Sequence, residues 1–171
     1  MKKQGFTLIE LMVVIVIMGI LAAVAVPKLF GMIAKSKASE VGPAAGTYVK
    51  LQDAYVSESN KVGSWKLIGY VAPGAATASV EGATTNFKYL AGSDVAVAGD
   101  AQDVKDFSAI TWAAANKVAL NDCAAQADAD AAGANWTLTT AGASNGNSVS
   151  YTADVSDKCE QLTPTFEKIG K

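Results

Sequence analysis

The sequence predicts an α+β fold in which one long N-terminal α-helix packs on an antiparallel β-sheet of about four strands. Three observations predict it: an apolar run near the N-terminus that holds a single charge, an amphipathic stretch after it, and short segments of alternating apolar and polar residues in the second half. Periods of about 3.6 and 2 residues are those of helices and strands. The 171 residues suffice for one domain behind the apolar segment.

The first predicted element is an apolar helix long enough to span a membrane. Residues 11–26 carry no charge, and residues 7–9 extend the run to roughly the 20 residues that a spanning helix needs. Gly19 and Pro27 weaken it, since glycine costs about 1 kcal/mol in a helix interior and proline lacks a backbone donor. We expect a bend or local melting between them; the alternative, favoured for a single subunit, is a gentle proline kink in an intact helix.

Glu10 is the one charge between Gly5 and Pro27. A charged side chain inside a bilayer costs on the order of 3 kcal/mol, so its presence indicates a function and requires a partner. Cleavage after Gly5 would create an α-amino group on Phe6. The amine of a neighbouring copy would then be a natural partner for the Glu10 carboxylate.

The letters G-F-T-L-I-E-L, followed by M-V-V-I-V-I-M-G-I-L-A-A-V-A-V-P, carry a family resemblance. The segment resembles the class III leader and N-terminal helix of type IV pilins and type II secretion pseudopilins. The resemblance implies cleavage by a prepilin peptidase between Gly5 and Phe6, with N-methylation of Phe6. The expected parts are a leader at residues 1–5, a membrane or fibre-core helix at 6–30, and a globular head at 31–171 that includes the amphipathic half of the helix.

This resemblance implies a structural role, as a type IV pilus subunit that polymerises through its N-terminal helix into a surface filament for adhesion or motility. Phe6 and Glu10 are the expected assembly contacts, and the stretch from Gly19 to Pro27 is expected to unwind in the packed fibre. The expected partners are further copies of the chain, prepilin peptidase, the inner-membrane pilus or type II secretion assembly machinery, and membrane lipid before assembly. The precursor would cross the bacterial inner membrane once, and the filament would be extracellular.

Two other functions stay open. A type II secretion pseudopilin would act in the periplasm as a short piston. A monomeric signal-anchored binding protein would stay in the membrane and make no contacts between copies.

The stretch after Pro27 predicts a helix that packs on the head. Apolar residues recur three and four apart at Val41, Ala45, Tyr48, Leu51 and Tyr55. The Gly-Pro pair at residues 42–43 is expected either to bend this helix or to split it. A helix that ran to about residue 57 would extend roughly 75 to 80 Å, so its apolar half needs lipid or other copies to cover it.

Short segments in the second half predict the strands of the sheet. Their residues alternate between apolar and polar, as in a half-buried antiparallel sheet. The turn-forming stretch at 141–147 indicates a hairpin between the last two. Residues 65–72 are expected to be a strand or an extended loop. The strand candidates are residues 86–90, 107–112, 116–120, 135–139 and 148–152.

Cys123 and Cys159 are the two cysteines. An even count in a chain with an exported head favours a disulfide, which would contribute roughly 3 to 4 kcal/mol on the chain-entropy model. The alternative is a pair of reduced, buried thiols; a metal site is disfavoured without histidine or a C-x-x-C spacing. The resemblance agrees, because many type IV pilins link a C-terminal loop in this way, whereas major pseudopilins commonly lack the bridge.

The composition argues against enzymes and nucleic-acid-binding proteins. All 14 basic residues are lysine, and histidine is absent. Removal of Lys2 and Lys3 with a leader would leave 12 Lys against 16 Asp and Glu, which moves the net charge from −2 to −4. No nucleophile has a recognisable base beside it, so we expect no catalytic residue, no cofactor and no metal.

Calcium binding is the alternative for one acidic group, because pseudopilins often bind calcium near the sheet. We favour a solvated acidic loop for Asp94, Asp100, Asp103 and Asp106. The pair Asp128 and Asp130 lacks the glycine placement of a calcium loop and is expected at the surface.

Two further groups of residues concern the surface of the head. The triplet at residues 135–137 fits the N-x-T glycosylation pattern, which is weak evidence inside a predicted strand. Aromatic residues of the head are numerous enough to form an adhesive platform, but aromatics in strands are usually core. We expect Phe87, Trp112 and Tyr151 in the core and Trp65 as the first candidate for exposure.

Overall fold

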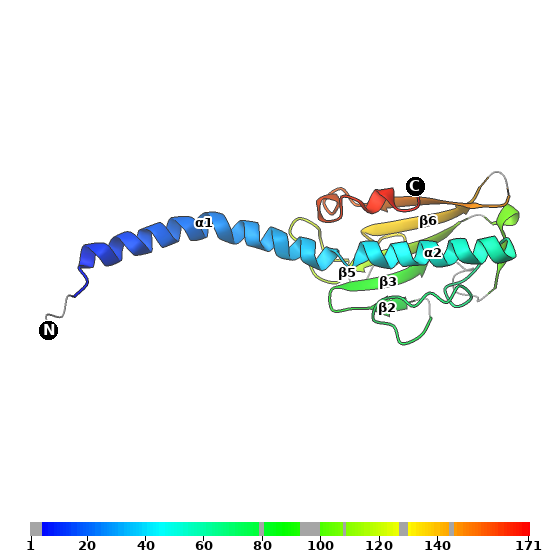
Figure 1. Ribbon diagram of the computed structural model, residues 1–171, viewed down its shortest axis with the longest axis horizontal. Helices are drawn as coiled ribbons and strands as arrows, with labels where there is room; N and C mark the ends of the chain where they lie inside the picture. Colours follow the sequence, from blue (N-terminus) through cyan, green and yellow to red (C-terminus); the bar gives the residue numbers. More distant parts are fainter. Residues whose placement is uncertain (1–4, 79–80, 93–99, 108, 127–129, 144–145) are drawn as a thin grey trace.

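The computed structural model of the protein describes residues 5–78, 81–92, 100–107, 109–126, 130–143 and 146–171 (Figure 1). Two helices, α1 (Leu8–Ala38) and α2 (Val41–Ser59), follow each other in a long rod. α1 projects away from the rest of the chain, whereas α2 lies across one face of a sheet (Figure 1). The fold is α+β, as the sequence predicts.

α1 is one unbroken helix. It remains helical through both Gly19 and Pro27, and it curves gently along its length (Figure 1). A proline in a helix interior removes one hydrogen bond and bends the axis without having to end the helix. The single subunit therefore has the intact, gently curved helix, while unwinding in a packed fibre stays a prediction.

The rod is interrupted at Ser39 and Glu40, which form a turn between α1 and α2. Pro43 lacks the N–H that would donate to the carbonyl of Ser39 in a continuous helix. The same property makes proline acceptable in the first turn of α2, where backbone N–H groups have no helical partner. The Gly-Pro pair thus splits the helix in two, which is one of the two predicted outcomes.

α2 buries one face against the sheet. Val41, Ala45 and Tyr48 are fully buried, as their spacing predicts, whereas Leu51 and Tyr55 lie half-buried at the margin of this face. The buried row continues instead through Gln52 and Val56. With its amide suitably oriented, Gln52 bonds both the N–H and the C=O of Gly63, at 3.0 and 3.2 Å. This pairing explains how a polar side chain is accommodated in an apolar row.

The main sheet has five antiparallel strands in the order β2-β3-β5-β6-β7. Three of the strand predictions are confirmed with shifted ends, namely β3, β6 and β7, and the last two form the predicted hairpin. About four strands were predicted, and the fifth strand is the short β2. The strands are β2 (Glu81–Ala83), β3 (Phe87–Gly92), β5 (Ile110–Asn116), β6 (Trp136–Gly142) and β7 (Val149–Val155).

The region of β5 corrects two predictions. Residues 107–112 and 116–120 were expected to form separate strands, but a single strand ends at Asn116 and residues 117–119 leave the sheet. Most of β5 is buried on both faces, with alanines at 113–115. A strand covered on both sides has no apolar-polar alternation, so the period-2 pattern is lost there.

The connection between α2 and β3 contains another correction. β1 (Lys61–Val62) pairs with β4 (Gln102–Asp103) in a separate two-stranded sheet, and the 3₁₀ turn η1 (Val104–Asp106) follows β4. Residues 65–69 form a turn and not a strand. Trp65, the expected exposed aromatic, is fully buried, with its ring 4.8 Å from that of Tyr70. The expectation was wrong because a loop that folds back over α2 buries its aromatic anchor.

The main core lies between α2 and the sheet and is rich in aromatic rings. Phe87, Trp112 and Tyr151 belong to it, as predicted. On the other face of the sheet, Leu90, Ala113 and Ala115 form a smaller cluster with Ala131 and Ala134 of the segment before β6. The C-terminal segment, with the 3₁₀ turns η2 (Glu160–Leu162) and η3 (Phe166–Lys168), closes the main core, since the ring of Phe166 stacks on Trp112 at 6.3 Å.

Candidate assembly surface

The apolar side chains of α1 are exposed, although they are among the most hydrophobic of the chain. Phe6 is 89% exposed and Ile15 is 60% exposed, whereas the large apolar side chains of α2 and the sheet are buried or half-buried. The exposed set consists of Phe6, Leu8, Ile9, Leu11, Met12, Val13, Val14, Ile15, Val16, Ile17, Met18, Ile20, Leu21, Val24, Val26, Leu29, Phe30, Met32 and Ile33. We call this set the α1 surface.

The extent of the α1 surface exceeds that of ordinary exposed apolar patches. Patches beyond a few hundred Å² mark contacts with proteins or membranes. By length and composition, the rod from Leu8 to Ser59 contains a stretch that can cross a membrane. At 1.5 Å per residue, the 31 residues of α1 span about 46 Å. The surface encircles the helix, so it suits lipid or several neighbouring helices better than one flat partner.

Glu10 lies at the start of α1 and is held by Thr7 of the same chain. The backbone N–H and the hydroxyl of Thr7 donate to Glu10 Oε2 at 2.8 and 2.7 Å, and the N–H of Glu10 donates to Thr7 Oγ1 at 3.3 Å. This arrangement is a capping box, which satisfies two backbone donors that the first turn of a helix leaves free. Pairing of Glu10 with the Phe6 amine of another copy stays a prediction.

Thr7, which holds the Glu10 carboxylate, was not among the residues predicted for this site. The signal was available, because Thr-x-x-Glu at residues 7–10 is the pattern of a capping box before an apolar run. The box orients the carboxylate toward the end of the helix where cleavage after Gly5 would leave a positive charge. It also reduces the cost of a carboxylate in an apolar segment, since the charged oxygen accepts two hydrogen bonds.

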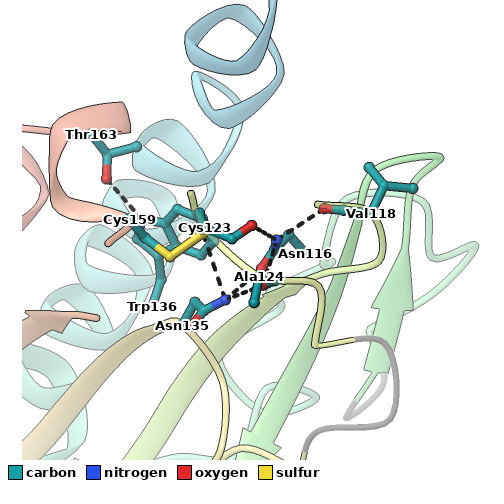
Figure 2. Close-up of a disulfide and its surroundings, with 8 residues drawn as sticks. All are labelled: Asn116, Val118, Cys123, Ala124, Asn135, Trp136, Cys159 and Thr163. Carbon is teal, nitrogen blue, oxygen red and sulfur yellow. Dashed lines mark hydrogen bonds between the residues drawn. A yellow bond between two sulfur atoms is a disulfide. The ribbon is translucent and has the colours of Figure 1, made fainter. Parts of the chain in front are cut away.

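Cys123 and Cys159 form the predicted disulfide. Both residues are buried, and the bond joins the loop after β5 to the segment after β7. Figure 2 shows the bond beside two asparagines, Asn116 and Asn135, whose side chains face the loop that carries Cys123. The C-terminal segment is thereby tied to the sheet, as the sequence analysis expected.

The acidic residues do not converge in the described part of the chain. No group of three or more His, Cys, Asp or Glu that suits a metal is found among the described residues. Asp106 lies 3.9 Å from Lys105 in an exposed ion pair, and Asp130 accepts a hydrogen bond from the N–H of Gly133. Asp94 and Asp128 lie outside the described residues.

Asn135 is a poor candidate for glycosylation in the folded head. Its side chain is 6% exposed, and its amide donates to Asn116 Oδ1 at 2.7 Å and to the carbonyl of Ala124 at 3.0 Å. A buried amide with these partners is inaccessible to a bulky sugar. The N-x-T pattern at 135–137 therefore has a structural explanation in this fold.

Buried tyrosines join α2 and the loop before β2 to the sheet. Tyr48 bonds Thr140 at 3.1 Å, and the indole of Trp112 donates to Tyr70 at 2.9 Å. Burial raises the pKa of Tyr48 and of Tyr70 to about 12. Tyr151 donates to Asp53 at 2.7 Å, and burial together with this carboxylate raises the pKa of Tyr151 well above its usual range.

The comparisons with known proteins give one family model, at the N-terminus, and several relatives that match part of the chain. Residues 1–26 match the model of the prokaryotic N-terminal methylation motif. The fimbrial protein EcpC of Eikenella corrodens is 39% identical over 97 residues, which is 57% of each chain.

Two further relatives match shorter stretches. The type IV major pilin protein PilA of Myxococcus xanthus is 42% identical over 60 residues, 35% of this chain and 27% of its own. A type IV major fimbrial protein FimA of Dichelobacter nodosus is 56% identical over 39 residues, 23% of this chain and 25% of its own. The aligned stretch thus covers just over half of the EcpC chain and about a quarter of the other two. In its methylation motif, in its matches to these relatives, and in a long N-terminal helix packed on an antiparallel sheet, the chain is similar to proteins of the type IV pilin family.

Proposed function

We propose that this chain is a structural subunit of a type IV pilus, which polymerises through α1 into a surface filament. The observation that carries the proposal is the α1 surface, an apolar helix that the head leaves uncovered. The names of the relatives, which are fimbrial proteins and a major pilin, favour a pilus over a secretion pseudopilus. The disulfide agrees with this choice.

Burial of the α1 surface among neighbouring helices is the main driving force of the proposed assembly. Apolar surface that is removed from water stabilises an assembly by about 25 cal/mol per Å². For a helix of this size, burial therefore makes a large but nonspecific contribution to the free energy of assembly. In a membrane, lipid already covers part of the α1 surface. The rest of the free energy of assembly then comes from packing between helices. A head-to-tail contact that does not close into a ring produces a filament.

Specific register comes from the charged end of α1 in this proposal. A prepilin peptidase cleaves between Gly5 and Phe6, and the new Phe6 amine, which is N-methylated, pairs with Glu10 of a neighbouring subunit. Residues 1–5 are then the leader, 6–30 the membrane and fibre-core segment, and 31–171 the head. The precursor resides in the inner membrane and the mature subunit in the extracellular filament, with the pilus assembly machinery as partner.

Two substitutions at Glu10 separate charge from capping. Glu10→Gln keeps a side chain that completes a capping box but removes the charge, whereas Glu10→Ala removes both. If the carboxylate pairs with a Phe6 amine, both variants lose most surface filaments, measured by electron microscopy and by the subunit content of sheared material. Glu58→Ala, at an exposed acid of α2, is the matched control and keeps filaments.

Filaments at wild-type abundance for Glu10→Gln would show that capping, not charge pairing, is the role of Glu10. Mass spectrometry of the exported protein provides a separate check, since the proposal requires loss of residues 1–5 and one added methyl group on Phe6. Electron microscopy also distinguishes a pilus from a periplasmic pseudopilus, because the latter gives no surface filaments.

A further inference from the structure

The two halves of the disulfide are each held by hydrogen bonds that do not involve the S–S bond. On one side, the amide nitrogen of Asn116 donates to the carbonyls of Val118 and Ala124, both at 2.9 Å. The N–H of Gln126 donates to the carbonyl of Asn116 at 2.7 Å. The loop that carries Cys123 is therefore fastened to the end of β5 (Figure 2).

Asn135, just before β6, completes this fastening. Its amide nitrogen donates to Asn116 Oδ1 at 2.7 Å and to the carbonyl of Ala124 at 3.0 Å, and it lies 3.6 Å from the sulfur of Cys123. Within the loop, the N–H of Cys123 donates to the carbonyl of Leu120 at 3.1 Å. The sulfur of Cys123 is thus held near Asn116, at the end of β5, and Asn135, just before β6. We call the hydrogen bonds of these two asparagines the frame.

The segment that carries Cys159 is also hydrogen-bonded to Asn135, just before β6. The carbonyl of Asn135 accepts the N–H of Ser156 at 2.9 Å, and the carbonyl of Ser156 accepts the N–H of Cys159 at 2.7 Å. One residue further, the indole of Trp136 donates to Thr163 at 2.7 Å. Asn135 therefore holds the Cys123 loop by its side chain and the Cys159 turn by its backbone.

We propose that Asn135 is a positioning residue for oxidation of the cysteine pair, which brings Cys123 into bonding register with Cys159 before the disulfide forms. The disulfide then locks an arrangement that buried amides have already selected. A buried amide with two strong acceptor partners is costly to misplace, so the frame has one favoured geometry.

The chemistry is ordinary thiol–disulfide exchange with a disulfide oxidant, such as oxidised glutathione. One cysteine thiolate attacks the oxidant, forms a mixed disulfide and releases one of its thiols. The thiolate of the other cysteine then attacks the protein sulfur of this mixed disulfide and releases the second thiol. The protein loses two protons and two electrons, and the oxidant gains them as two thiols. Positioning accelerates the second, intramolecular step.

A variant that cannot form the disulfide tests whether the frame exists without it. In full-length Cys159→Ser in detergent micelles, the proposal requires the amide hydrogens of Leu120, Cys123 and Gln126 to remain protected from exchange, as in the oxidised protein. Exchange of these three amides at the rate of an unfolded chain, while the amides of β3 stay protected, would overturn the proposal. This measurement does not depend on the stability of an Asn135 variant.

Reoxidation measures the effect of Asn135 on the reaction itself. Reduced full-length protein in micelles is placed in a fixed glutathione buffer, quenched with an alkylating agent and analysed by mass spectrometry. Asn135→Ala is expected to slow ring closure and to lower the equilibrium constant of the pair about tenfold, because the amide bonds that orient Cys123 are lost.

Tyr48→Phe is the matched control, since it loses a different buried hydrogen bond of the head, to Thr140, far from the cysteines in the sequence. It is expected to reoxidise at the wild-type rate. Equal slowing in both variants would show that the effect reflects a general loss of stability of the head, and it would contradict the proposal. An Asn135→Ala protein that forms the disulfide as fast as wild type would contradict it as well.

Discussion

The apolar half of the rod and the head use hydrophobic residues in opposite ways. In α1, Ile15 and Leu21 are more than half exposed, whereas in the head Trp112, Trp136 and Tyr48 are fully covered. Both regions are rich in apolar residues, and the difference lies in what surrounds them. The head satisfies its hydrophobic surface within one chain, and α1 retains that surface for contacts outside the chain.

The two regions also differ in how far apart in the sequence their hydrogen-bonded polar groups lie. The head contains buried hydroxyls and amides whose partners come from elements far apart in the sequence, such as Tyr48 with Thr140 and Tyr151 with Asp53. The capping box of α1 joins Thr7 and Glu10, three positions apart. Tertiary packing therefore determines the structure of the head, whereas local interactions determine that of α1.

Alkaline pH is expected to unfold the head and to leave α1 helical. The pKa of Tyr48 and of Tyr70 is about 12 in the folded head and about 10 in an unfolded chain. Between pH 10 and 12 the unfolded chain releases protons that the fold retains, so stability falls as pH rises. The loss is about 1.4 kcal/mol per pH unit for each tyrosine, or roughly 5 kcal/mol for both at pH 12.

Urea unfolding of the full chain in micelles, followed by circular dichroism at several pH values, measures this loss. Tyr89 and Tyr151 also have raised pKa values in the folded head, so Tyr48→Phe removes one of four such groups. The slope between pH 10 and 12 is expected to fall by about a quarter. A free energy of unfolding that stays constant between pH 10 and 12 would contradict the assignment.

Trp136→Ala is expected to destabilise the head by about 3 to 5 kcal/mol, because it leaves a cavity beside Phe87 and removes the partner of Thr163. The helical signal of α1 should persist after the head has melted. Ile15→Ala is the matched control on the α1 surface, and it should leave the unfolding midpoint of the head unchanged. If both substitutions lowered this midpoint equally, the two regions would be one cooperative unit.

Thr7→Ala is expected to have the smallest effect and to act on α1 alone. Loss of the N-cap side chain costs about 1 kcal/mol, confined to the first turn. Hydrogen exchange in micelles should show faster exchange at the amides of Glu10 and Leu11 and no change in the head. Thr47→Ala, at another exposed helical threonine that bonds the carbonyl of Pro43, should leave the amides of α1 unaffected. Unchanged exchange at Glu10 in Thr7→Ala would show that the capping box adds little.

The features that depend on local pattern could be predicted from the sequence. The α1 helix follows from an apolar run with one charge, and the break between α1 and α2 follows from Pro43. The β6–β7 hairpin follows from alternation on both sides of a turn-forming stretch. The disulfide was favoured because an exported chain with two cysteines usually pairs them.

The features that depend on tertiary cover could not be predicted. β5 was divided into two segments because burial of both faces removes the alternation that marks a strand. Trp65 was expected at the surface because nothing local shows that its loop folds back over α2. Asn116 and Asn135 lie 19 positions apart, so their pairing follows only from the register of β5 and β6.

The joint between α1 and α2 has a mechanical consequence. The chain crosses it once, at Ser39 and Glu40, and the carboxylate of Glu40 accepts hydrogen bonds from Thr84 at 2.6 Å and from Tyr89 at 3.2 Å. In a fibre whose core is α1, tension along the axis passes from helix to helix and does not load the head. A pull on the head reaches the core through this joint, where Glu40 couples the sheet to the rod, and through Ala34 and Ala38 of α1, which are buried in the main core of the head. In such a fibre, α1 would bear the tension along the axis, and the head would make the contacts with surfaces.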